Sequence, residues 1–325
     1  DPYAAEYSLP RPLPNDCSFF VKVLCEVDMG KLEPRAVDDY YDDNTQGFLR
    51  FGGATRRTGT LHRSLALPGA AGGARSGVEA VHAVHRLLVE SLTAHGLLES
   101  GEQMPLVADL GCGVGATMRW LETHAAVSTV GITVSDVQAK LARQRVGARV
   151  VAGSFECRED LARMAAGRSV DAAYLIEAFV HAGDADALFG AIATVCRPGS
   201  LLVIIDDFPT PRLLAGRADT AAARLNRRLA RDFRHGWHIG SFYSAGGVAE
   251  LAARHGWILV ETTDLSPFVV TTRPRDYAAR LGSWPARLLG MDGSFYRNII
   301  GGSALQRLIR RRLIRYQRVV FRLTG

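Results

Sequence analysis

The sequence predicts an α/β fold with a doubly wound, mostly parallel sheet of seven strands. The first observation is a change of pattern at Leu106, after which short apolar runs alternate with helical segments. Five runs are long enough for buried strands, at 106–110, 128–133, 148–152, 170–176 and 201–206. The second observation is the alternation itself, because strand–helix–strand units pair their strands in parallel through right-handed crossovers. Two later runs, 257–263 and 314–323, would add a sixth strand and a last strand at the sheet edge.

The other segments divide the chain into a cap and a sheet domain. Residues 1–76 are rich in Pro, Tyr, Asp and Gly and are expected to form an N-terminal helical cap. Residues 77–325 are expected to form the sheet domain, with a substrate-capping insertion near 209–245 and a basic C-terminal tail. Within that tail, 306–318 is interpreted as an amphipathic helix packed on the sheet. Helices are predicted at 78–95, 115–124, 136–146, 157–166, 185–196, 218–234 and 246–255.

The composition excludes several classes of protein. With 47% hydrophobic and 22% charged residues among 325, the chain can bury a core and is not of the disordered class. No apolar run approaches the ~18 residues needed to cross a bilayer, so no membrane span is expected. The five cysteines are scattered and form no C-x-x-C pair or disulfide framework, which indicates a reducing, cytoplasmic setting.

The most specific motif is ADLGCGVGA at 108–116, which follows an apolar strand and opens a helix. Glycines in that context let the backbone approach a ligand and leave amide groups pointing at it. A dinucleotide site needs G-x-G-x-x-G and an acid about 20 residues further on. Here the third glycine comes one residue early and the acid, Asp109, lies within the strand. A nicotinamide or flavin site and a glycine-rich turn without a ligand stay open as alternatives.

The spacing D-x-G-x-G-x-G resembles motif I of the class I S-adenosylmethionine-dependent methyltransferases, with Asp109, Gly111, Gly113 and Gly115 in its positions. The resemblance implies S-adenosylmethionine as the cofactor. The chain departs from the commonest pattern of that class twice, because the second strand ends in Thr133 and the third is followed by Ser154, where acids are usual.

The string GITVSDVQ at 131–138 resembles the subgroup that includes sterol and other isoprenoid C-methyltransferases, in which hydroxyl and amide groups replace the ribose carboxylate. This resemblance places Thr133 and Gln138 at the ribose and methionine end of the cofactor. It places Ser154 and Phe155 at the adenine. Thr133 and Ser135 are also suited to cap the following helix, and both interpretations can hold together.

Glu177 is the candidate catalytic base. It directly follows the fourth predicted strand, and ligands of doubly wound sheets sit beyond the carboxyl ends of the strands. Bordered by Phe179 and Val180, this carboxylate would be partly desolvated and suited to accept a proton. The alternative is a surface acid at a strand end.

The segments 40–53 and 59–69 resemble the front of bacterial isoprenoid C-methyltransferases, especially those acting on geranyl or isopentenyl diphosphate, and the resemblance spans about residues 37–270. It implies methyl transfer to an alkene carbon, with Glu177 deprotonating the carbocation and Tyr41 stabilising it through its aromatic face. The candidate substrate-binding residues are Arg50, His62, Phe179, His181, Arg228, Trp237 and Tyr243. A diphosphate also needs further cations or a metal ion. Arg63 is a candidate cation, and Asp206 and Asp207 are candidate Mg²⁺ ligands.

The expected partner is therefore a small isoprenoid, with no nucleic acid, and a homo-oligomer is compatible with the sequence. Three alternatives stay open. One is methylation of an oxygen, a nitrogen or a prenyl side chain of an aromatic natural product. Another is an interaction protein that uses the basic tail and retains a vestigial cofactor fold. The third is a nicotinamide oxidoreductase.

Overall fold

The computed structural model describes residues 57–67, 77–98, 103–147, 149–215, 220–271 and 294–325. The expected cap lies largely outside these ranges, as do Tyr41 and Arg50. The strands are β1 Leu106–Leu110, β2 Ser128–Thr133, β3 Val150–Ala152, β4 Val170–Ile176, β5 Cys196–Pro209, β6 Trp257–Asp264 and β7 Ile314–Leu323. The helices are α4 Val78–Ala94, α5 Ala116–His124, α6 Asp136–Val146, α7 Arg158–Ala165, α8 Ala185–Ala193, α9 Pro211–Leu214, α10 Ala221–Gly236, α11 Ala245–Ala253 and α13 Ser294–Arg310, with 3-10 turns η1 Phe179–His181 and η2 Ser266–Phe268.

The strands form one sheet in the order β3-β2-β1-β4-β5-β7-β6, which confirms the predicted doubly wound sheet of seven strands. The first five strands run parallel, and β7 pairs antiparallel with both β5 and β6. The prediction that 314–323 forms an edge strand is wrong. The run Val319, Val320 and Phe321 is fully buried, because apolar side chains on both faces of the strand suit a place inside the sheet. The edge is β6.

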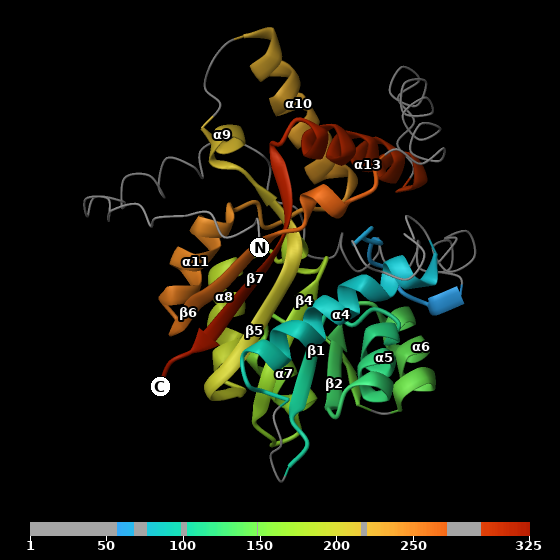
Figure 1. Ribbon diagram of the computed structural model, residues 1–325, viewed down its shortest axis with the longest axis vertical. Helices are drawn as coiled ribbons and strands as arrows, with labels where there is room; N and C mark the ends of the chain where they lie inside the picture. The colour runs from blue at the N-terminus through green and yellow to red at the C-terminus, as the bar shows by residue number, and fades with distance from the viewer. Residues whose placement is uncertain (1–56, 68–76, 99–102, 148, 216–219, 272–293) are drawn as a thin grey trace, which may run out of the picture. The chain divides into compact units, whose positions relative to one another are not determined.

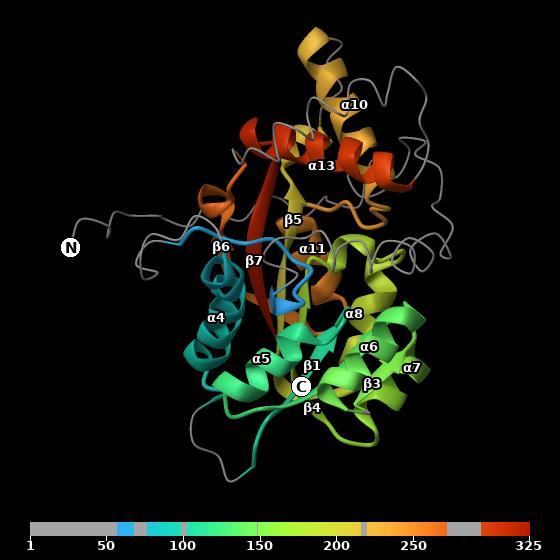
Figure 2. The same cartoon turned by 90° about the vertical axis from the view of Figure 1, so that its right-hand side faces the viewer.

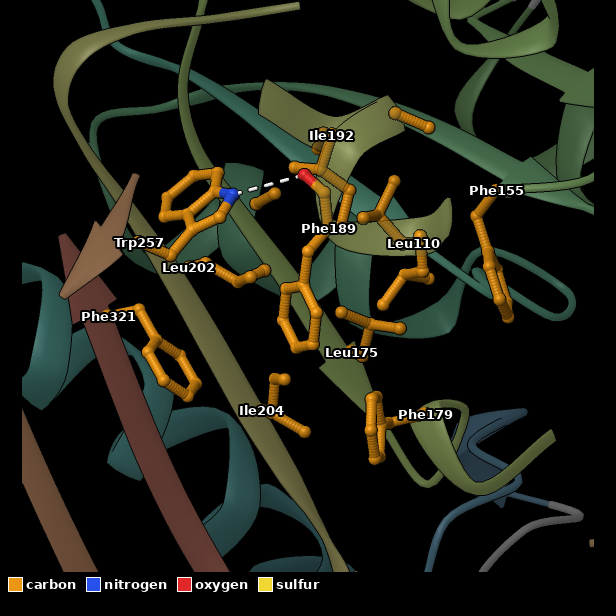
Figure 3. Packing of buried hydrophobic residues seen from close by; sticks show 14 of the residues in the cluster. Leu110, Phe155, Leu175, Phe179, Phe189, Ile192, Leu202, Ile204, Trp257 and Phe321 are labelled. Carbon is orange, nitrogen blue, oxygen red and sulfur yellow. Dashed lines mark hydrogen bonds between the residues drawn. The ribbon is translucent and has the colours of Figure 1, made fainter. Parts of the chain in front are cut away.

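Helices cover both faces of the sheet (Figures 1 and 2). On one face α7, α8 and α11 pack over a core that includes Leu188, Phe189 and Trp257. Figure 3 shows the Trp257 indole donating to the carbonyl of Phe189, with a donor–acceptor distance of 3.2 Å, and the Phe189 ring lies 6.0 Å from that of Phe321. On the other face α4 packs through Val84 and neighbouring side chains. The sheet is thus rigidly held, and its strand ends can carry a site.

A third core lies beyond the carboxyl end of β5, where α10 and α13 pack on each other (Figure 1). It contains Leu229 and Phe233 from α10 and Leu305 and Leu308 from α13. The segment expected as an insertion, near 209–245, contributes α9 and α10. The prediction of one amphipathic helix over 306–318 is wrong, because α13 ends at Arg310 and β7 begins at Ile314. None of the helices in the described ranges has the length and apolar character that a membrane crossing needs.

Removing the Phe321 ring tests the interior position of β7. We expect Phe321→Ala to lower the free energy of unfolding by about 3–5 kcal/mol, because its ring is fully buried and the sheet cannot collapse around the cavity. Ile258→Ala is the matched control on the edge strand β6, where the side chain is 54% exposed, and should change stability by less than about 1 kcal/mol. Urea denaturation measures both. Equal losses would contradict the burial difference between the two strands.

Candidate active site

The glycine loop joins β1 to α5 at the carboxyl end of the sheet. Gly111, Gly113 and Gly115 all have positive φ, at 93°, 52° and 74°, a region that side chains rarely adopt. A Cβ built on Gly111 would lie only 2.6 Å from the Cβ of Ala178, so this turn admits glycine alone without a shift. The amides of Gly111 and Cys112 both donate to the carbonyl of Ile132 at 2.9 Å, which fixes the loop to β2.

The residues expected at the ribose and methionine end gather beside this loop. The Thr133 hydroxyl donates to Oε1 of Gln138 at 2.9 Å, and both side chains are buried. Ser135 caps α6 by accepting from the backbone amide of Gln138 at 3.1 Å. The Gln138 Oε1 atom lies 4.0 Å from the position of a Cβ built on Gly113. Thr133, Gln138 and the loop are therefore neighbours.

The residues expected at the adenine follow β3. Ser154 begins the loop between β3 and α7, where its hydroxyl accepts from the amide of Glu156 at 3.1 Å. Phe155 is largely buried in the sheet core, and its ring edge lies 3.8 Å from a Cβ built on Gly111. Phe155 thus adjoins the glycine loop, whereas the Ser154 hydroxyl takes part in a local turn.

Asp109 is buried near the end of β1 and interacts with the neighbouring strand. It accepts a 2.7 Å hydrogen bond from the hydroxyl of Tyr174 on β4. Burial raises the pKa of Asp109 to about 7, and the Tyr174 hydrogen bond opposes this only in part. Asp109, which was expected to bind the cofactor, is therefore a buried carboxyl group that pairs with Tyr174 on the neighbouring strand.

Asp109→Asn tests this protonation state. The folded protein holds the Asp109 proton up to about pH 7, whereas the unfolded chain releases it near its ordinary pKa of 3.8. The folded state binds more protons in this window, so the contribution of Asp109 to stability falls as pH rises through it. We expect Asp109→Asn, which stays neutral, to gain stability relative to the parent between about pH 4 and about pH 8, by on the order of a few kcal/mol.

Urea denaturation at both ends of that range measures this gain. Tyr174→Phe is the companion variant. It removes the hydrogen bond that lowers the pKa of Asp109 and should extend the loss of stability to higher pH. A constant difference between parent and Asp109→Asn across the range would show that Asp109 is ionised throughout.

The loop offers backbone donors that suit a carboxylate such as that of S-adenosylmethionine. In the part of the chain that the structure describes, the amides of Gly113 and Val114 donate to no backbone carbonyl. The first amides of α5 are likewise without helical partners, and such donors at a helix N-terminus favour an anion. The positive φ values favour glycine at these positions, and the Leu61 side chain also adjoins the loop, with its Cδ1 atom 3.3 Å from a Cβ built on Gly113.

Glu177 occupies the end of β4 in a left-handed conformation, with φ of 51°. Its Oε1 atom accepts from the backbone amide of Arg63 at 3.0 Å, from Nε of Arg63 at 2.7 Å and from the hydroxyl of Tyr316 at 3.1 Å. The Arg63 Nη1 and Nη2 atoms donate to the two oxygens of Asp207 at 3.1 and 2.5 Å. One guanidinium therefore bridges two carboxylates from β4 and β5.

The charge state of Glu177 follows from this network. Burial acts to raise its pKa, but the Arg63 guanidinium, His62 and the hydrogen bonds from Arg63 outweigh it, so that the pKa of Glu177 lies below its usual value. Its side chain keeps 17% exposure. Glu177 is therefore an ionised and partly accessible carboxylate.

Asp206 and Asp207 do not form the Mg²⁺ site that the sequence suggested. Asp207 is occupied by Arg63. Asp206 accepts from the amides of Val180 and Asp207 at 3.1 and 2.8 Å, and burial beside Asp207 raises its pKa well above the usual range. Among the described residues, no group of three or more potential ligands could hold a metal ion. The two acids are adjacent on β5, and Arg63 supplies the positive charge that a Mg²⁺ ion was expected to provide.

His62 is paired with a second histidine. Its Nδ1 lies 2.9 Å from the carbonyl of Arg63 and its Nε2 lies 2.9 Å from Nε2 of His85 on α4. A carbonyl only accepts, so Nδ1 of His62 carries a proton. Burial lowers the pKa of both rings. His62 therefore adjoins the Glu177 network as a largely neutral side chain.

The remaining substrate candidates are dispersed. Phe179 is fully buried between the rings of Phe189 and Phe208, with centroids 6.1 Å from each, and is a core residue. His181 lies 3.3 Å from the carbonyl of His238 through Nδ1, and burial lowers its pKa to about 4. Arg228 is exposed on α10, Trp237 donates to the carbonyl of Asn298 at 3.2 Å, and Tyr243 is 37% exposed. The structure brings His62 close to Glu177, and the Glu177 charge also acts on His181. Phe179 and Trp237 make their contacts elsewhere.

The roles of Arg63 and Tyr316 were not evident from the sequence. Arg63 was expected to bind a diphosphate, and it pairs with carboxylates instead. Tyr316 lies on β7 directly opposite Asp207 on β5, and its ring stacks 4.3 Å beneath the Arg63 guanidinium. The signal that would have revealed Tyr316 is the register of an antiparallel strand inside the sheet.

Comparisons with known proteins identify a methyltransferase domain in the chain. Residues 108–204 match the family model described as a methyltransferase domain. The chain is 32% identical over 170 residues to an O-methyltransferase of Pyrenophora dematioidea, covering 49% of this chain and 56% of that protein. It is 30% identical over 186 residues to 24-methylenesterol C-methyltransferase 2 of Arabidopsis thaliana, covering 55% and 48%. The matches thus span about half the length of these relatives.

Two solved structures share the fold across most of the chain. A mycolic acid cyclopropane synthase complexed with SAH and CTAB has a TM-score of 0.66 at 20% identity, covering 91% of this chain and all of that one. A geranyl diphosphate C-methyltransferase of Streptomyces coelicolor, in complex with Mg²⁺, geranyl diphosphate and S-adenosyl-L-homocysteine, has a TM-score of 0.57 at 15% identity, covering 90% and 98%. Residues 108–204 are thus a methyltransferase domain, and the chain has the fold of the class I S-adenosylmethionine-dependent methyltransferases.

Proposed function

We propose that this protein transfers a methyl group from S-adenosylmethionine to an alkene carbon of a small isoprenoid. The observation that carries the proposal is Glu177, a carboxylate that Arg63 keeps ionised beside the glycine loop. With its pKa below the usual value, it is a weak base that suits neither an alcohol nor an ammonium group as proton donor. A carbocation, in contrast, loses an adjacent proton to weak bases, and an ionised carboxylate also stabilises its positive charge.

The residues of the site perform two tasks in this reaction. S-adenosylmethionine supplies, when bound, an electrophilic methyl group. The alkene π pair forms the new bond to the methyl carbon, and the pair of the broken carbon–sulfur bond leaves on sulfur. Glu177 then accepts the proton next to the cationic carbon, and that C–H pair restores a double bond. Arg63 and Tyr316 stay bonded to the carboxylate and hold it in place.

We further propose a short prenyl diphosphate as the substrate. The fold similarity to a geranyl diphosphate C-methyltransferase supports this choice, as do the exposed arginines of α10, among them Arg228. Glu177 and Asp207 would repel a diphosphate, so its phosphates lie toward cationic residues and its alkene toward Glu177. The alternative is methylation of an oxygen, a nitrogen or a prenyl side chain of an aromatic natural product, and the 32% identical O-methyltransferase favours it.

A product screen with methyl-labelled S-adenosylmethionine distinguishes these possibilities. The panel contains isopentenyl and geranyl diphosphate, their dephosphorylated alcohols, and prenylated and unprenylated phenols. Labelled methyl on a carbon of the diphosphates supports the proposal. Label on phenolic oxygen supports the second candidate. A protein that binds S-adenosylhomocysteine in calorimetry and labels none of these compounds would refute the proposed substrates.

A further inference from the structure

Arg63 holds the Glu177 carboxylate from a distant part of the chain. It precedes Glu177 by 114 positions, and in the described part of the chain it provides two of the three hydrogen bonds that the carboxylate accepts, from its backbone amide and from Nε. The third comes from the hydroxyl of Tyr316. All three donors reach the same oxygen, Oε1.

The guanidinium is itself fixed on its other sides. Its Nη1 and Nη2 atoms form a bidentate pair with Asp207, and its plane lies over the Tyr316 ring at 4.3 Å. Only arginine presents this planar fork, because a lysine ammonium would supply the charge without the geometry. Arg63 therefore connects the ends of β4, β5 and β7 in one orientation.

The backbone of Glu177 also requires support. A φ of 51° is a sparsely populated conformation for a residue with a side chain, at a cost of about 1–3 kcal/mol. The amide of Glu177 donates to the carbonyl of Ile205 at 2.9 Å, which anchors the main chain. The hydrogen bonds from Arg63 anchor the side chain, so both the main chain and the side chain of Glu177 are held in place.

We propose that Arg63 is a positioning residue of the methyl-transfer site. Its hydrogen bonds engage Oε1 of Glu177, so that Oε2 is the oxygen that accepts the substrate proton. This rests on the proposed function of Glu177 as the base. Among the residues that the structure describes, the charged and titratable groups that act on Glu177 include His62, Arg63, His181, Asp206, Asp207 and Tyr316. Arg63 is the arginine of this set, so its removal should raise the pH at which Glu177 becomes ionised.

Arg63→Gln and Arg63→Lys test this role, with Arg86→Gln as the matched control. Arg86 also pairs with a glutamate, Glu79, but that pair is exposed on α4. We expect Arg63→Gln to lower kcat by at least about tenfold and to move the acidic limb of the pH–kcat profile upward by about one unit or more. Arg63→Lys should retain the position of this limb and recover kcat only in part, since it restores charge without the fork. Arg86→Gln should match the parent.

A second readout does not depend on turnover. The pH titration of the Glu177 carboxyl, followed by ¹³C NMR and assigned by its loss in Glu177→Gln, should move upward in Arg63→Gln. Loss of Arg63 leaves the buried Asp207 carboxylate without its ion-pair partner. If this unfolds the chain, the double variant Arg63→Gln with Asp207→Asn removes both charges and is titrated in its place. An unchanged titration and pH profile would overturn the proposal. If the Glu177 titration depended on Arg63 but the protein methylated no alkene, the proposed function would be refuted. The positioning of Glu177 by Arg63 would still stand.

Discussion

Glu177→Gln is expected to lower kcat by ~10²–10⁴-fold, the range that a positioned general base contributes. The amide keeps the size of the side chain and an acceptor for Arg63, but it cannot take up the proton whose loss from the carbocation restores the double bond in the proposed reaction. S-adenosylhomocysteine affinity should stay at the parent value, because Glu177 holds no part of the glycine loop. Single-turnover kinetics and calorimetry with the same preparation measure the two quantities.

The matched control is Glu79→Gln, which removes an exposed carboxylate that also pairs with an arginine. It should leave kcat unchanged. If Glu177→Gln retained nearly the parent kcat, transfer to a substrate oxygen by proximity would be the better account. If both kcat and S-adenosylhomocysteine affinity fell together, Glu177 would instead support the binding crevice.

Local patterns were sufficient to predict most of the fold. The buried strands β1, β2 and β4 are short runs with mostly apolar or small side chains. The periodic apolar positions of α4 place that helix at 78–94 against a predicted 78–95. The glycine loop is likewise a local feature, since its positive φ values demand glycine at fixed spacing. Neighbouring residues thus determine both its conformation and its place after a strand.

The contacts of the site could not be predicted in the same way. Arg63 lies in a short segment with no periodic pattern, and its ion pairs reach 114 and 144 positions along the chain. An arginine near a predicted diphosphate site is equally suited to bind phosphate or carboxylate, and only the fold decides between them. Tyr316 faces Asp207 because β7 runs antiparallel to β5, a register that depends on β7 lying inside the sheet.

Gly111→Ala is expected to weaken cofactor binding strongly, because it disturbs the conformation of the glycine loop. A Cβ at Gly111 would clash with Ala178 at 2.6 Å and would sit at a φ of 93°, so the loop must shift. Overpacking costs about 1–3 kcal/mol and left-handed strain about 1–2 kcal/mol. Since the shifted loop can no longer present its amides to the cofactor, we expect S-adenosylhomocysteine affinity to fall by about 10- to 100-fold or more.

Gly147→Ala separates strain from the clash, because Gly147 also has a positive φ, of 80°, but a Cβ there meets nothing within 4 Å. That variant should lose about 1–2 kcal/mol of stability and bind S-adenosylhomocysteine like the parent. Calorimetric titration and thermal melting of the two variants therefore report separately on the binding loop and on general backbone strain. Equal affinity in Gly111→Ala and the parent would mean that the cofactor does not rest on this loop, and the assignment of the site to the class I methyltransferases would lose its central support.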